Sequence, residues 1–355
     1  MTVALACAVL GAVVATLLAP GAGAIDRDSP VHGDRSLAAA AVEELDGAPV
    51  HALSVAEVTS QGTRTATVDA PLHGTVEIGS VSKALTGMLY EDMVADDEIS
   101  PDQRLGTLLD LGDAPAADVT LEQLAQHRSG LPRLNMGVSA MARMLASQLL
   151  ATSPYDATVQ DVVDDVRDAD LDADRPQYSN LGFAALGHAL AAAAGTDYPA
   201  LVRDRLAEPL DLETLRIPDG PEDLGERAVP GVDANGRPQQ SWADVGYAAA
   251  GGIRADAATM AQLARALLDG TAPGMAALEP TEEFTDDDRI GAGWLVSKDD
   301  GRTITWHDGG TGGFRTWFGL DRERGTAVFL SGATTADLDA VGQALLHEAG
   351  EEQAS

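Results

Sequence analysis

The stretch "EIGSVSKALTG", Glu77–Gly87, places a serine and a lysine three positions apart where a helical pattern begins. On a helix, positions i and i+3 share one face, so Ser80 and Lys83 would lie one turn apart. A serine hydroxyl needs a base to become a nucleophile, and a lysine removed from water can act as that base. The plainer interpretation is a serine that caps the helix and a lysine at the surface. The rest of the chain must decide between these two interpretations.

The composition is that of an acidic chain with enough apolar residues for one large domain or two ordinary ones. Of its 355 residues, 45% are hydrophobic and only 4% are aromatic, so the core must rest on Ala, Leu, Val and Ile. The formal net charge is -33. A charge of this sign repels nucleic-acid phosphates and anionic lipids. We therefore expect no nucleic-acid partner and a heavily solvated acidic surface.

The first 24 residues, "MTVALACAVLGAVVATLLAPGAGA", have the pattern of a targeting segment. The apolar run Val3–Leu18 is short for a membrane span, and "AGA" at 22–24 matches the A-x-A cleavage pattern of signal peptides. We expect residues 1–24 to be a signal peptide and the protein to be secreted or extracytoplasmic. No Lys or Arg precedes the run, so the true start could lie upstream, or the segment could stay as a membrane anchor.

Cysteine usage and one acidic segment argue against metal sites. Cys7 is the only cysteine, and it lies inside the leader, so the mature chain would have neither disulfides nor cysteine-metal sites. The segment "DADLDADRPQYS", which starts at Asp168, opens like a calcium-binding loop. It has Ala173 where that loop requires glycine and Ser179 where it requires glutamate. We therefore expect a solvated acidic turn there.

Strand-like patterns lie towards both ends of the chain. "VHALSVAEV" and "TRTATV", between residues 50 and 68, flank Gln61-Gly62 and predict a hairpin. "GAGWLVS", "TITWH", "FRTWFGL" and "TAVFLSG", between residues 291 and 332, are short alternating segments joined by turns. They predict an antiparallel meander.

Helical patterns lie between and after these strands. One helix is predicted from about Ser80 to Val94 and another from about Ala336 to Ala349. The middle of the chain, about 98–246, is mostly helical and acidic, and includes "SAMARMLASQLLA" at 139–151. The pattern predicts an α/β (α+β) domain over residues 25–355, in which an antiparallel sheet built from both chain ends is flanked by helices and a helical region is inserted.

Two further motifs contain side chains that could take part in chemistry. In "QYSNLGFAALG", Tyr178 and Asn180 open an apolar helix, and taken alone they would be a core ring and a helix cap. In "WHDGGTGGF", His307 ends a strand and glycines follow, which taken alone would be a turn with the histidine near the surface. Three such motifs in this order are stronger evidence for a shared site than any one of them.

Together, the motifs resemble those of the penicillin-recognising serine hydrolases, which include class C β-lactamases, D-alanyl-D-alanine carboxypeptidases, esterases and D-aminopeptidases. The S-x-x-K motif of that family matches Ser80–Lys83, its Y-x-N motif matches Tyr178–Asn180, and its H-x-G motif matches His307–Gly309. The segments "QHRSGLP" at 126–132, "AAGGIRADAATMAQLARAL" and "GAGW" resemble lesser landmarks. The resemblance covers about residues 35–345 and implies a β-lactamase-like fold.

The resemblance implies a covalent mechanism. Ser80 would attack a carbonyl and form an acyl-enzyme, while Lys83 and Tyr178 would share the base and acid roles. The sequence leaves open which of the two takes the first proton. The substrate would be a small molecule or peptide with an ester, amide or peptide bond, and no metal or cofactor is needed.

The resemblance also assigns the residues that would bind the substrate. Asn180 would hold the amide or ester carbonyl region, and His307 would supply a donor beside the tyrosine, where other members have lysine. Gly309 completes the H-x-G motif, and the oxyanion would lie between the backbone N–H groups of Ser80 and Gly310.

Asp308 departs from the family pattern, which usually has Thr or Ser there to help bind a substrate carboxylate. A negative charge at this position predicts weak activity on penicillins, cephalosporins and D-Ala-D-Ala peptides. Uncharged esters or substrates with a free amine would be better. Alternatively, Asp308 turns away from the cleft or pairs with His307 or a nearby arginine, and then repels nothing. An alternative function is a catalytically silent protein that binds cell-wall peptides or penicillin on the same scaffold. The presence of Ser80, Lys83 and Tyr178 together argues against it.

Overall fold

The computed structural model describes residues 23–134, 157–172 and 175–354. Most of the predicted leader and the helix predicted at 139–151 lie outside the described residues. No helix within the described ranges is both long enough and apolar enough to cross a bilayer.

An antiparallel sheet, nine-stranded within the described residues, forms the centre of the fold. In spatial order its strands are β1 (Val31–Gly33), β3 (Gly62–Val68), β2 (Leu53–Thr59), β11 (Thr326–Gly332), β10 (Arg315–Asp321), β9 (Arg302–Gly310), β8 (Leu295–Asp299), β7 (Asp288–Ile290) and β6 (Glu282–Glu283). Because β2 pairs with β11, strands from the two ends of the chain meet inside the sheet. A separate small pair consists of β4 (Val76–Glu77) and β5 (Arg254–Ala255).

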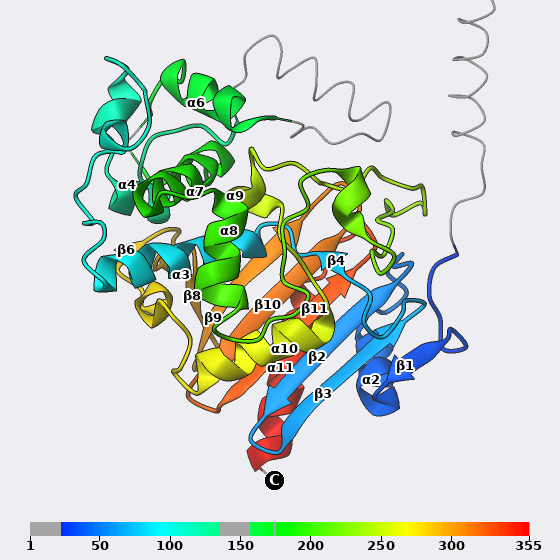
Figure 1. Ribbon diagram of the computed structural model, residues 1–355. Helices are drawn as coiled ribbons and strands as arrows, with labels where there is room; N and C mark the ends of the chain where they lie inside the picture. Colours follow the sequence, from blue (N-terminus) through cyan, green and yellow to red (C-terminus); the bar gives the residue numbers. More distant parts are fainter. Residues whose placement is uncertain (1–22, 135–156, 173–174, 355) are drawn as a thin grey trace, which may run out of the picture.

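Helices cover both faces of this sheet (Figure 1). The helices are α2 (Arg35–Glu44), α3 (Val81–Ala95), α4 (Leu121–Ala125), α6 (Val159–Arg167), α7 (Asn180–Ala194), α8 (Tyr198–Val202), α9 (Ala248–Gly251), α10 (Ala257–Leu268) and α11 (Asp339–Ala354). Single turns are η1 (Leu105–Thr107), η2 (Pro115–Asp118), η3 (Arg203–Ala207), η4 (Pro221–Leu224) and η5 (Met275–Leu278). α2 and α11 pack on one face, α3 and α10 pack on the other, and α4, α6 and α8 gather around α7 beside α3.

The two faces of the sheet carry separate apolar clusters. Trp317 belongs to the cluster under α2 and α11, whereas Phe318 belongs to the larger cluster that extends into the helical region. These residues are successive in β10, where side chains point alternately to opposite faces. His307 of β9 pairs with Phe318, so its side chain lies on the face that carries α3 and α7.

The predicted fold class is confirmed, with small shifts at element ends. The β2–β3 turn is Ser60–Gln61 rather than Gln61-Gly62, because Gly62 already pairs with Thr59 as the first residue of β3. The last helix begins at Asp339 rather than near Ala336. Neither shift affects the face of the sheet on which the motifs meet.

Candidate active site

Ser80 lies between β4 and α3, directly before the first helical residue. Its side chain makes no capping hydrogen bond to the helix. The preceding residue, Gly79, has a φ of +54°, a left-handed conformation that glycine adopts without steric cost. The interpretation of Ser80 as an ordinary helix cap is therefore wrong.

Lys83 is not a surface residue, because its side chain is fully buried. Its Nζ donates to the carbonyl oxygen of Ala250 at 2.5 Å and lies 3.1 Å from the Oγ of Ser80. Burial holds the pKa of Lys83 well below its ordinary value; the charge of Arg133 lowers it too, and the carboxylate of Asp308 opposes both. A neutral amine has a lone pair with which it can accept a proton from the serine hydroxyl.

The ring of Tyr178 lies beside this pair. Its centroid is 4.8 Å from the Nζ of Lys83 and 6.2 Å from the ring centroid of His307. The guanidinium carbon of Arg133 lies 5.4 Å from the same ring. The structure thus gathers Ser80 and Tyr178 around the buried lysine.

The helix that follows Tyr178 is capped by Ser179 rather than by Asn180. The Oγ of Ser179 accepts from the N–H of Gly182 and donates to the carbonyl oxygen of Pro132, both at 2.8 Å. Asn180 is the first helical residue and is buried, and its own N–H donates to the carbonyl oxygen of Arg133 at 3.2 Å. Asn180 is therefore buried at the N-terminal end of α7, close to Tyr178 in the sequence.

His307 is 1% exposed, so it is not a surface residue of a turn. Its Nδ1 donates to the carbonyl oxygen of Asp308 at 2.5 Å, and the Oδ1 of Asp308 is 3.7 Å from the same nitrogen. Burial lowers the pKa of His307; Asp308 opposes this shift, and the charge of Lys83 reinforces it. A neutral ring that donates through Nδ1 presents Nε2 as an acceptor. The side chain of Asp308 is 47% exposed.

The end of β9 approaches the turn before α3 very closely. A Cβ atom on Gly309 would lie 2.2 Å from the carbonyl oxygen of Ile78 and 3.3 Å from the backbone nitrogen of Ser80. Real side-chain atoms cannot come so near a carbonyl oxygen, so the absence of a side chain at Gly309 permits this contact. The glycine of the H-x-G motif therefore determines how near β9 comes to Ser80.

The N–H of Gly310 points away from β10. Thr311 donates its N–H to the carbonyl oxygen of Phe314 at 3.0 Å, which makes these two residues a hydrogen-bonded pair. Hydrogen-bonded and non-hydrogen-bonded pairs alternate in an antiparallel ladder, so the N–H of Gly310 faces the other edge of β9, where β8 pairs only as far as Trp306. Within the described residues, no backbone carbonyl accepts from the N–H of Ser80. Neither N–H group is therefore used in the backbone pairing of the described residues, as an oxyanion-binding role would require.

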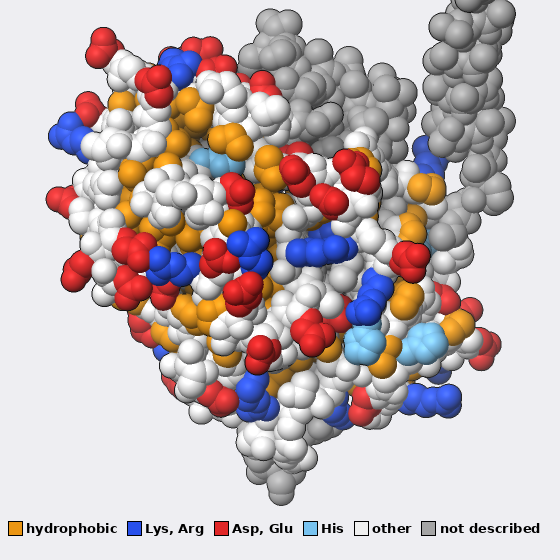
Figure 2. Space-filling view, viewed as in Figure 1, with side chains coloured by type: hydrophobic (Ala, Val, Ile, Leu, Met, Phe, Trp, Pro, Cys, Tyr) orange, Lys and Arg blue, Asp and Glu red, His pale blue; other side chains and the backbone are white. Residues whose placement is uncertain are grey.

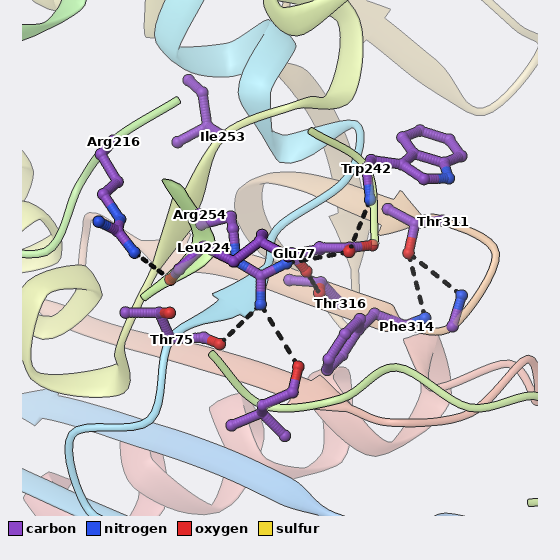
Figure 3. Close-up of polar contacts among 12 residues, drawn as sticks. Thr75, Glu77, Arg216, Leu224, Trp242, Ile253, Arg254, Thr311, Phe314 and Thr316 are labelled. Carbon is purple, nitrogen blue, oxygen red and sulfur yellow. Dashed lines mark hydrogen bonds and ion pairs between the residues drawn. The ribbon is translucent and has the colours of Figure 1, made fainter. Parts of the chain in front are cut away.

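A buried ion pair lies next to the turn that carries Ser80 (Figure 3). The Oε1 of Glu77 accepts from the Nη1 of Arg254 at 2.9 Å and from the N–H of Trp242 at 3.0 Å. Arg254 also donates through Nη2 to the carbonyl oxygen of Thr75 at 2.9 Å. Burial raises the pKa of the Glu77 carboxyl group, and the charge of Arg254 opposes that shift. The pair ties the strand just before Ser80 to β5 and to the loop before α9.

Four residues of this site were not predicted from the sequence: His127, Arg133, Glu77 and Arg254. The first two lie in or next to "QHRSGLP", which the sequence presents only as a landmark of the resemblance. Glu77 and Arg254 are lone charges in apolar segments, "VEIG" and "GGIRA". Charged residues are rarely buried without a partner, so these segments did contain a signal for an ion pair.

Three buried basic side chains, Lys83, His127 and His307, lie at the centre of the site. Burial is the main cause that lowers the pKa of Lys83, His127 and His307. In the part of the chain that the structure describes, no group of three His, Cys, Asp or Glu side chains could hold a metal ion. A hydroxyl, a buried amine, a phenol and two backbone N–H groups form a set suited to acyl transfer.

The antiparallel sheet, the helices on both faces and the helical region around α7 make up a β-lactamase-like fold. The family model described as "Beta-lactamase" matches residues 32–350, which is most of the chain. The protein therefore belongs to the β-lactamase family of serine hydrolases. A comparison with curated protein sequences gave no match.

Solved structures of low sequence identity share the fold. A class C β-lactamase from Rhodobacter sphaeroides is 18% identical with a TM-score of 0.72, and the match covers 90% of this chain and 99% of that one. A D-stereospecific amidohydrolase from Streptomyces sp. is 20% identical with a TM-score of 0.73, covering 88% and 98%. A β-lactamase/D-alanine carboxypeptidase from Pseudomonas syringae is 13% identical with a TM-score of 0.74, covering 90% and 99%.

Proposed function

We propose that this protein is an exported serine hydrolase that cleaves an ester, amide or peptide bond through an acyl-enzyme. The observation that carries the proposal is the 3.1 Å distance between the Oγ of Ser80 and the Nζ of buried Lys83, whose pKa is lowered by its surroundings. A hydroxyl beside a neutral amine is an activated nucleophile. The partner is accordingly a small-molecule or peptide substrate.

In the acylation step, the Oγ of Ser80 forms a bond to the substrate carbonyl carbon while its proton passes to the Nζ of Lys83. The carbonyl electron pair moves onto the oxygen, which the N–H groups of Ser80 and Gly310 stabilise. When the tetrahedral intermediate collapses, the bond to the leaving group breaks and that group takes a proton through Tyr178. Asn180 contacts the carbonyl region of the substrate next to the reacting bond.

In the deacylation step, water attacks the carbonyl carbon of the acyl-enzyme. Lys83 and Tyr178 again share the general-base role and take the proton of the water. The bond to Oγ then breaks as the serine recovers its proton. The ring of His307, 6.2 Å from that of Tyr178, is neutral, and a neutral neighbour does not raise the cost of protonating the lysine.

Export is supported by the leader alone. An apolar run followed by the "AGA" pattern at 22–24 precedes the charged segment that begins near Asp26. The hydrolase fold lies entirely after this segment, because the family match begins at residue 32. Removal of the leader would leave the site intact.

Covalent labelling with a fluorophosphonate probe tests the proposal directly. The probe should modify the wild type at Ser80, and fragmentation of the labelled peptide must distinguish Ser80 from Ser82. The variant Ser80→Ala should lose labelling and lose on the order of 10³-fold or more in the turnover of a p-nitrophenyl ester, because the covalent route is removed. The matched control Ser60→Ala, in the exposed β2–β3 turn, should keep both.

Two results would contradict the proposal. A folded wild type that binds a penicillin or a peptide but is never labelled would support the silent binding protein instead. Labelling at another serine in a correctly folded Ser80→Ala variant would move the nucleophile elsewhere.

A further inference from the structure

His127 holds the chain on both sides of Tyr178. Its carbonyl oxygen accepts the N–H of Gln177 at 2.8 Å, and its ring Nδ1 accepts the N–H of Ser179 at 3.1 Å. The tyrosine is therefore the residue between two hydrogen bonds that end on the same histidine. These two hydrogen bonds fix the backbone of Tyr178, from which the phenol side chain extends.

The imidazole also packs on the phenol itself. The ring centroids of His127 and Tyr178 are 4.5 Å apart, with the planes tilted by 35°. The ring centroid of Phe183, a residue of α7, lies 4.6 Å from that of His127. His127 is 1% exposed. Its φ of +57° places it in the left-handed region, which is uncommon for a residue with a side chain. Such strain persists only where the surroundings over-determine it, and it concentrates at functional sites.

The charge state of the imidazole follows from its surroundings. Burial holds the pKa of His127 well below its ordinary value, and the charges of Lys83 and His307 lower it too. The ring is neutral, and because Nδ1 accepts from Ser179, the ring proton lies on Nε2. A neutral imidazole adds no positive charge beside Lys83, whose amine must be neutral to act as a base.

We propose that His127 is a positioning residue for Tyr178, which it fixes beside Lys83 by bonding both neighbours of the tyrosine and packing on its ring. This inference rests on the proposed function, in which the phenol transfers protons. Proton transfer requires the donor and acceptor atoms to be held within hydrogen-bond reach, and small displacements cost large factors in rate. The histidine need not touch the substrate to have this effect.

A matched pair of substitutions tests the hydrogen bond to Ser179 together with the left-handed backbone of His127. His127→Asn and His127→Leu create side chains of nearly the same shape, but only asparagine has an atom near the former Nδ1 that can accept this bond. Leucine should lower kcat for a neutral p-nitrophenyl ester by on the order of tenfold or more, with KM changed less than about threefold. Asparagine, which also tolerates the left-handed backbone, should stay within about threefold of wild type in kcat.

A double-mutant cycle with Tyr178→Phe separates positioning from general structural damage. If His127 acts through the tyrosine, His127→Leu should cost less than about twofold in the Tyr178→Phe background. Thermal unfolding of each variant reports any loss of stability separately. If the leucine variant does not fold, His127→Gln takes its place, because its amide lies one methylene further from the backbone and misplaces the acceptor.

The outcomes are distinct. Equal fold losses in the two backgrounds, or an asparagine variant as slow as the leucine variant, would overturn the positioning role while Ser80 is still labelled in the wild type. Absence of Ser80 labelling in the wild type would overturn the proposed function and this inference with it. A cycle with strong non-additivity and rescue by asparagine would support both.

Discussion

Asp308 is the residue whose charge we propose affects the choice of substrate. It lies at the end of β9 with its Oδ1 3.7 Å from the Nδ1 of His307. Its carboxylate raises the pKa of Lys83 and of His307, although burial outweighs it at both. It also contributes, after burial, to the raised pKa of about 7 at Asp339. The negative charge of Asp308 therefore acts on Lys83, His307 and Asp339.

Replacing Asp308 by threonine should relieve repulsion of anionic substrates. Two like charges 4 to 5 Å apart repel by roughly 3–4 kcal/mol at an effective dielectric near 20, and solvent screening of a half-exposed carboxylate reduces this. We expect Asp308→Thr to raise kcat/KM for p-nitrophenyl succinate, an anionic ester, by on the order of tenfold. The neutral acetate ester should change by less than about twofold.

The control for this prediction is Asp113→Thr, an exposed aspartate in the turn before η2, which should leave both esters unchanged. If the wild type already prefers the anionic ester and Asp308→Thr does not change that preference, the carboxylate does not act on the substrate. Added NaCl should shrink the difference between the two esters in the wild type, because salt screens exposed charges.

At the scale of elements, the site depends on how closely β9 approaches the turn before α3. Gly309 makes that approach possible, since a Cβ atom there would lie 2.2 Å from the carbonyl oxygen of Ile78. The same approach sets the separation of the two backbone N–H groups that would hold an oxyanion, those of Ser80 and Gly310. A strand and a helix end therefore act together, and neither alone forms the binding position.

The variant Gly309→Ala should push β9 away from the turn that carries Ser80. Loss of one well-placed oxyanion donor typically costs about 10²–10³-fold in kcat, so we expect a loss of at least roughly this size in ester turnover. Gly312→Ala, in the turn after β9, is the matched control, because its nearest contact would be an ordinary 3.8 Å from Gln239. Equal activity of the two alanine variants would show that the close approach is not needed.

The local sequence pattern predicted the helices and strands that are long enough to show a periodicity of their own. α3 begins within a residue or so of its predicted start, and β9, β10 and β11 cover the alternating segments near the end of the chain. β6 and β7 are too short to show alternation, and pairing between neighbours alone defines them. Ser179, rather than Asn180, caps α7 because its hydroxyl also reaches the carbonyl oxygen of Pro132.

The same distinction separates the predicted site residues from those that were missed. Ser80 directly precedes α3 and Lys83 lies in its first turn, so their spacing in the sequence already implies proximity. His127 meets the tyrosine motif across 52 positions of sequence, through a bond to Ser179. No local pattern contains such a contact, because it depends on how a loop and a helix pack together. The contact between "QHRSGLP" and the tyrosine motif could therefore be recognised only from the folded structure.

At the scale of the whole molecule, negative charge dominates the surface. Figure 2 shows acidic side chains spread over the visible face with fewer basic ones between them. A single arginine, Arg205, contacts three carboxylates, those of Asp92, Asp96 and Glu98. The chain has 56 acidic and 23 basic residues, so carboxylates outnumber cations by more than two to one and the net interaction among surface charges is repulsive. Mutual repulsion of this kind opposes the compact state.

Salt should therefore stabilise the folded protein. The screening length falls from about 30 Å at 0.01 M to about 3 Å at 1 M salt, so repulsion between distant carboxylates fades sooner than attraction within buried pairs. We expect the Tm to rise by about 2 °C or more between low-salt buffer and 1 M NaCl, in a thermal scan at constant pH. A sucrose solution of equal osmolality is the control for excluded-solute effects. A Tm that falls with NaCl would mean that surface ion pairs outweigh the net repulsion.

The buried contacts around Ser80 also determine when the protein can become active during its synthesis. The bond from Lys83 to the carbonyl oxygen of Ala250 spans 167 positions of sequence, and the ion pair between Glu77 and Arg254 spans 177. Contacts of such long range form only after most of the chain has been made, and loop closure makes them slow to form. A nascent or truncated chain thus carries a serine beside a hydrated, protonated lysine, which is a poor nucleophile. Under the proposed function, reactivity appears only once residues 250–254 have been made and have packed against Lys83 and Glu77, so a growing polypeptide does not attack carbonyl groups around it.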